Sequence, residues 1–143
     1  MKRNLVLTCI LVSAMAFLCG CASPGKRELS RFQGTWVGHE ISGPTGDCRM
    51  TVVGDSLKFQ GAQPQEWYAA KFIPNPNAAP NEADVLIQDC PAPQYIGKTA
   101  KGIYRLEGKT LTIAANEPGD DSRPTGFDRN ATSRARVFVF TRP

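Results

Sequence analysis

Short stretches in which apolar and polar residues alternate follow one another from about residue 31 to the end of the chain. In Leu57-Lys58-Phe59-Gln60 the alternation is strict, which is typical of a strand with one buried face. Turn residues such as Gly54-Asp55 and Glu107-Gly108 separate neighbouring stretches. The pattern predicts eight strands: Arg31–Ile41, Cys48–Val53, Ser56–Gln60, Glu66–Ile73, Asp84–Cys90, Ala100–Leu106, Lys109–Ala115 and Arg134–Arg142.

These strands predict an all-β fold, an eight-stranded antiparallel up-and-down barrel. Short connections favour an antiparallel meander over a parallel sheet, and closing the meander into a barrel removes both exposed edges. A two-sheet sandwich is the alternative, because the strand count agrees with it as well. One helical turn is expected around Arg27–Phe32. The segment Pro74–Asn81 is not expected to continue a strand, since its prolines lack the N–H that a ladder needs.

The first 20 residues follow a different pattern. Lys2 and Arg3 precede an apolar run from Leu5 to Leu18, and Gly20 follows it closely. A positive start, a short apolar run and a small residue at its end are the layout of a cleaved signal peptide. The run is shorter than the roughly 20 apolar residues that usually span a bilayer.

The residues Leu18-Cys19-Gly20-Cys21 resemble the lipobox of bacterial lipoproteins. The resemblance implies cleavage before Cys21 and attachment of acyl chains such as palmitate to it, which would hold the protein on a membrane. The expected organisation is a signal peptide (1–20), a lipidated tether (21–31) and a barrel domain (32–143). By resemblance to lipoprotein sorting, Ala22 and Ser23 imply the outer membrane, facing the periplasm. An ordinary secretory signal that contains cysteine is the alternative.

The charge of the mature chain is nearly balanced. Without Lys2 and Arg3, 15 basic and 13 acidic side chains remain, and they form no basic run. Nucleic acid is therefore not an expected partner. A mature chain of this length predicts a single domain, which we expect to be a monomer.

Two cysteines remain once the signal peptide and the acylated Cys21 are set aside. Cys48 and Cys90 form an even pair in an oxidising compartment, which predicts a disulfide. Two free buried thiols are the alternative. With His39 as the only histidine, the chain has no zinc-site spacing, so neither a metal nor another cofactor is expected.

The residues Gly34-Thr35-Trp36, near the start of the first predicted strand, resemble the first signature of lipocalins. The resemblance implies that Trp36 plugs the closed end of the barrel and that a basic residue of the last strand, Arg142 or Arg136, packs across its ring.

More of the chain is similar to a narrower group, uncharacterised bacterial lipoproteins with a lipocalin-like domain. The stretches that carry this similarity are Leu29–Trp36, Lys101–Leu111 and Arg123–Phe127. This resemblance implies a fold and no particular activity.

The sequence offers little for catalysis, since no serine or cysteine stands in a nucleophile motif and no pair of groups is poised to move a proton. An enzyme is therefore not expected. The first hypothesis is a binding module for a small apolar or amphipathic ligand or an envelope component. The alternative is an interaction protein, such as an inhibitor of an envelope hydrolase, that acts through its loops.

Connectivity places the loops after the first, third, fifth and seventh strands at the rim that faces away from the lipid. Tyr95, Arg123 and Phe127 are the ligand-binding candidates among them, because they supply apolar area and a fixed charge in otherwise polar loops. The alternative for Phe127 is that it pins its loop onto the barrel.

Overall fold

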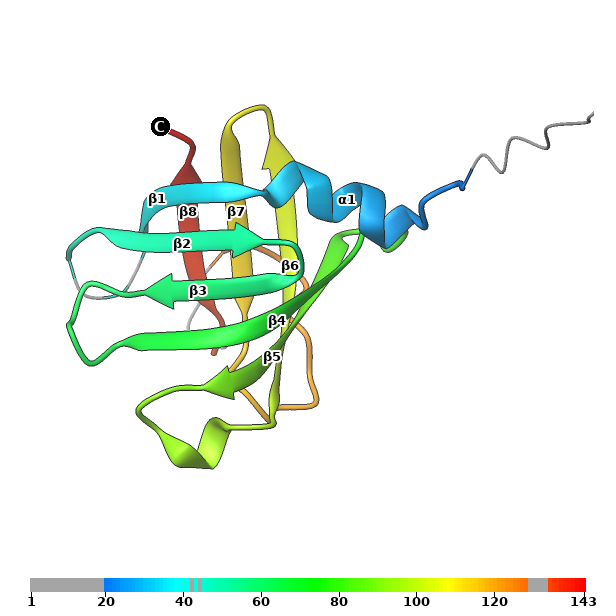
Figure 1. Ribbon diagram of the computed structural model, residues 1–143. Coiled ribbons are helices and arrows are strands. Elements are labelled where there is room, and N and C mark those ends of the chain that lie inside the picture. Colours follow the sequence, from blue (N-terminus) through cyan, green and yellow to red (C-terminus); the bar gives the residue numbers. More distant parts are fainter. Residues whose placement is uncertain (1–19, 42, 44, 129–133) are drawn as a thin grey trace, which may run out of the picture.

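The computed structural model describes residues 20–41, 43, 45–128 and 134–143. The predicted signal peptide therefore lies outside the described residues, except for Gly20. The elements are α1 (Pro24–Phe32), β1 (Gly34–Glu40), β2 (Cys48–Val53), β3 (Ser56–Gln60), β4 (Trp67–Asn75), β5 (Asn81–Asp89), the 3-10 turn η1 (Pro93–Tyr95), β6 (Thr99–Glu107), β7 (Thr110–Ala115) and β8 (Arg136–Thr141). Figure 1 shows the helix beside one end of the strands.

The eight strands form one closed antiparallel barrel. Each strand pairs with the next one along the chain, and β8 pairs with β1, with Glu40 opposite Phe138. This confirms the all-β, eight-stranded up-and-down barrel with lipocalin-like topology, and it excludes the two-sheet sandwich. Closure gives every strand a partner on both sides over at least part of its length, which is the usual reason for such a fold.

The two tight hairpins predicted from glycine lie between β2 and β3 and between β6 and β7. Gly54 has a φ of +61° and Gly108 a φ of +60°. Each is the first central residue of a two-residue turn, where a positive φ matches the twist of the flanking strands and favours glycine.

The proline-rich segment departs from the prediction. β4 continues through Pro74 to Asn75, and Pro74 lies opposite Ala83 of β5. The other neighbour, β3, pairs with β4 only as far as Lys71. Pro74 therefore stands where its strand has no partner on one side, and a missing N–H is tolerated at such a position.

The helix is also longer than the single turn expected, and it begins within the predicted tether. α1 packs against β4 and buries Glu28 and Phe32. Residues from Pro24 onward thus belong to the folded domain. All the elements and all buried side chains of the described chain lie between Pro24 and Thr141, so a chain that begins at Ala22 retains the whole domain.

The order of the strands gives the barrel two different ends. α1, the start of β1, and the hairpins after β2, β4 and β6 lie at one end, here called the closed end. The connections after β1, β3, β5 and β7 lie at the other end, here called the mouth. The segment that leads to α1 therefore meets the barrel opposite the mouth (Figure 1).

Candidate binding site

The mouth of the barrel holds a cavity of about 440 Å³. Tyr68, Ile87, Ala100 and Phe138 line it from the inner faces of four strands. The segment after β5 contributes Cys90 and Tyr95, and the segment after β7 contributes Glu117. The wall is thus largely apolar, while ionisable groups stand around the opening.

The closed end is filled by aromatic side chains. Trp36 is fully buried, and its Nε1 donates a hydrogen bond of 2.8 Å to the carbonyl oxygen of Phe32, the last residue of α1. The Phe32 ring meets Phe72 and Tyr104 edge-on, at centroid distances of 4.8 and 5.1 Å. The helix therefore acts as a plug, and this packing leaves the mouth as the hollow end.

The guanidinium carbon of Arg142 lies 4.3 Å from the centroid of the Trp36 ring. This confirms the predicted cation–π contact and decides it in favour of Arg142. Arg136, the other candidate, points into the mouth instead.

A cluster of three charged side chains lies beside the cavity. Arg136 donates to both carboxylate oxygens of Glu40, with Nη2···Oε2 at 2.6 Å and Nε···Oε1 at 3.1 Å. It also donates to Glu66, which comes from the connection between β3 and β4. The side chain of Glu40 is only 4% exposed. Carboxylates at that depth need a partner, and the two hydrogen bonds from Arg136 supply it.

The tyrosines of the barrel are held in their neutral form. Burial, with a further contribution from nearby Glu66, raises the pKa of Tyr68 above its usual range. Burial also raises the pKa of Tyr104, whose hydroxyl donates to Glu28 Oε1 at 2.9 Å. The pKa of Tyr95 is raised because its hydroxyl donates to Glu117.

These pKa shifts predict a loss of stability in alkaline solution. A tyrosine with a raised pKa keeps its proton in the folded chain after the unfolded chain has lost it, so its contribution is complete below about pH 10 and falls above it. We expect the folded protein at about pH 10 to show much less phenolate absorbance than the same protein in denaturant. Equal phenolate absorbance in both samples would contradict this.

The predicted disulfide is absent, and Cys48 and Cys90 are free thiols. Cys48 is held in the ladder of β2, opposite Gly38 of β1, and cannot lean across the mouth. Cys90 Sγ donates to the carbonyl oxygen of Ala92 at 3.1 Å. With β3 and β4 between the cysteines, three strand spacings separate them by about 14 Å around the wall, and a bridge allows about 7 Å between Cα atoms. Burial raises the pKa of Cys48, which keeps it a thiol.

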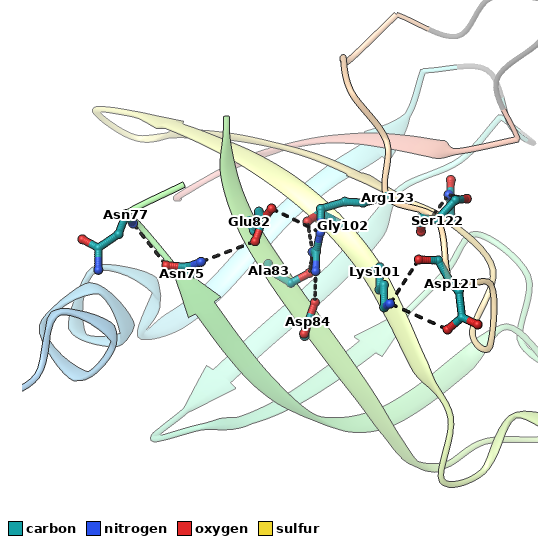
Figure 2. Close-up of polar contacts among 11 residues, drawn as sticks. Asn75, Asn77, Glu82, Ala83, Asp84, Lys101, Gly102, Asp121, Ser122 and Arg123 are labelled. Carbon is teal, nitrogen blue, oxygen red and sulfur yellow. Dashed lines mark hydrogen bonds and ion pairs between the residues drawn. The ribbon is translucent and has the colours of Figure 1, made fainter. Parts of the chain in front are cut away.

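Arg123 lies on the outer wall of the barrel and not at the rim (Figure 2). Its guanidinium donates to the carbonyl oxygen of Gly102 and to Asp84 Oδ1, both at 2.7 Å. Asp121, beside it in the same segment, pairs with Lys101 of β6 at 3.7 Å. These contacts hold the segment after β7 against β5 and β6.

Phe127 pins that segment to the barrel further along. It packs on a separate apolar cluster formed by Ile103, Ala114, Ala135 and Val137. Arg105 lies over its ring, 4.9 Å from the centroid. The alternative considered from the sequence is thus confirmed for Phe127. Of the three ligand-binding candidates, Tyr95 alone lines the cavity.

The sequence does not mark the charged residues of the mouth as a group, and it suggested a different role for Arg136, the contact with Trp36. Glu40, Glu66 and Arg136 come from three parts of the chain that only barrel closure brings together. For these three residues the sequence offers one signal, the alternation of apolar and polar positions, which indicates whether a side chain faces into or out of the barrel. Within the part of the chain that the structure describes, no group of three His, Cys, Asp or Glu residues could hold a metal ion.

Comparison with protein-family models, curated proteins and solved structures gives no match for this chain. The resemblance to lipocalin-like lipoproteins therefore stays a prediction from the sequence. Among residues 20–41, 43, 45–128 and 134–143, no helix has the length and apolar character to cross a bilayer.

Proposed function

We propose that this protein is a lipid-anchored envelope protein whose barrel mouth binds a small apolar or amphipathic molecule. The observation that carries the proposal is the cavity of about 440 Å³ at the mouth. Small-molecule sites are usually concave, mostly apolar, and between about 300 and 1,000 Å³ in volume, with a few polar groups that orient the ligand. The mouth combines an apolar wall with ionisable groups at its opening.

The position of Cys21 supports the membrane-anchored part of the proposal. Cys21 is exposed and stands three residues before α1, which covers the closed end. Acyl chains on this residue would place the closed end toward the membrane, with the mouth directed away from it. A ligand could then enter from the side opposite the anchor.

Replacing Cys21 by alanine should abolish lipid attachment, because Cys21 is the cysteine that directly follows Gly20 in the lipobox-like motif. Cells that express the wild type or Cys21→Ala would be fed a traceable fatty acid, and the purified proteins compared for label. We expect label in the wild type only. Equal labelling of the two proteins would refute lipidation at this residue.

The ligand-binding part is tested by filling the cavity. Ala100 is buried and points inward from β6. In Ala100→Phe, the added ring should occupy the mouth and reduce binding of an apolar fluorescent probe at least tenfold. Mass spectrometry of the domain purified from its own host should find a retained small molecule in the wild type and less of it in the variant.

Val53→Phe is the control, because Val53 is 71% exposed at the end of β2, beside the closed-end hairpin. It adds the same ring outside the barrel and should leave probe binding unchanged. If Ala100→Phe remains folded and binds the probe as tightly as the wild type, the cavity is not the site.

A second candidate function is recognition of an envelope protein through the loops at the mouth. It is favoured by two large apolar side chains that are exposed there, Ile41 after β1 and Ile96 between β5 and β6. Exposed apolar groups in loops are common at protein interfaces. Replacing both isoleucines by glutamate would weaken the binding of such a partner protein and leave the binding of a small ligand unchanged.

A further inference from the structure

The charged side chains in and directly beside the cavity do not cancel. Arg136 is shared by two carboxylates, because it donates to both oxygens of Glu40 and also to Glu66. The cavity is also lined by Glu117 and by Arg134, which is exposed. The four charged groups that line the cavity balance, and the buried Glu40 beside Arg136 brings the five groups to one negative charge in excess. Arg136, the cation of the cluster, already has two acidic partners.

Glu66 keeps one oxygen available. Arg136 contacts its Oε1, whereas its Oε2 accepts no hydrogen bond from any residue that the structure describes. The carboxylate lies against Gly61, where an added Cβ would stand 2.2 Å from Oε2. Its side chain is 24% exposed and lines the cavity. Oε2 can therefore accept a hydrogen bond from a donor that enters the mouth, or form an ion pair with a cation there.

Aromatic rings surround the same space. Trp67, Tyr68, Tyr95 and Phe138 line the cavity. The face of an aromatic ring attracts cations, and quaternary ammonium groups are commonly bound in this way. Arg136 already occupies such a position over Phe138, with its guanidinium carbon 5.0 Å from the ring centroid.

We propose that the ligand of the mouth is a cationic amphiphile, an alkylammonium compound whose chain enters the cavity and whose head group lies between Glu66 and the aromatic rings. This inference rests on the proposed function. An anionic head group would instead meet Glu66 and Glu117, and among the described residues that line the cavity Arg134 is the one cation not held by the cluster. Repulsion between its negative charge and these carboxylates would weaken the binding of an anionic ligand relative to a cationic one.

The test compares three ligands that share a ten-carbon chain: decyltrimethylammonium, decanol and decanoate. Each is titrated into the chain that begins at Ala22 at neutral pH, below the micellar concentration of the two charged compounds and the solubility limit of decanol, with binding followed by calorimetry. We expect the cation to bind about tenfold or more tightly than decanoate, with decanol between them. Glu66→Gln should weaken binding of the cation by about fivefold and leave decanol unchanged.

Glu107→Gln is the matched control, since Glu107 lies at the closed-end hairpin with an exposed side chain. It should bind all three ligands like the wild type. If Glu66→Gln does not fold by circular dichroism, Glu117→Gln makes the same test. Tighter or equal binding of decanoate overturns the charge preference and leaves the proposed function standing. If none of the three compounds binds, both fail.

Discussion

Replacing Trp36 by alanine is expected to lower the free energy of unfolding by about 3–5 kcal/mol, the usual cost of removing a large aromatic side chain from a core. Trp36 is fully buried and fills the closed end together with Phe32. The substitution also removes the hydrogen bond from Nε1 to Phe32 and the ring on which Arg142 lies. Urea unfolding followed by circular dichroism measures the loss.

Trp67→Ala is the matched control, because Trp67 is 37% exposed at the mouth. It should cost less than Trp36→Ala, since more than a third of the Trp67 surface already meets water whereas Trp36 is fully buried. If the two variants lose the same free energy of unfolding, Trp36 is not the plug of the barrel.

The strand pattern could be predicted well wherever local rules decide it. β2 and β3 begin and end where the sequence placed them, because strict alternation and a glycine turn agree about the hairpin. Barrel closure was expected from the number of strands and their short connections, although the strand count agreed equally with a two-sheet sandwich. In such segments the local preference and the final fold point to the same structure.

The extent of α1 was not predicted, although Ser23-Pro24 is a pair of residues common at helix starts. Other signals of a helix start are missing. Ser23 makes no capping hydrogen bond with its side chain, and the first turn holds no acidic residue. The helix is instead stabilised by tertiary contacts, namely burial of Phe32 and the hydrogen bond from Tyr104 to Glu28. Packing of this kind has no local sequence signature.

The candidate site depended even more on tertiary structure. The cysteine count predicted a bridge, but the register of β2 fixes Cys48 away from Cys90. Arg136 and Glu40 are 96 residues apart, and the pairing of β8 with β1 brings them together. The contact of Arg142 with Trp36 was expected only through a family resemblance. Alternation gives the face of each strand, whereas register decides which side chains meet.

Replacing Arg136 by methionine is expected to lower the free energy of unfolding by about 2–3 kcal/mol. The change leaves Glu40, with its side chain 4% exposed, without either of its hydrogen bonds. Breaking a fully buried ion pair usually costs roughly 3–5 kcal/mol. The expected loss is smaller because Arg136 is 43% exposed, so water can reach the remaining carboxylates. Urea unfolding at neutral pH measures it.

A second substitution shows whether the uncompensated carboxylate is the cause. Adding Glu40→Gln to Arg136→Met removes the buried charge and should restore at least half of the lost free energy, since the two residues are in direct contact. Arg49→Met is the matched control, because Arg49 is exposed on β2 and has no ion pair among the described residues. It should change stability by less than about 0.5 kcal/mol. If the double variant is no more stable than Arg136→Met, the unpaired Glu40 carboxylate does not lower stability. Arg136 would then stabilise the barrel through its packing and not through its charge.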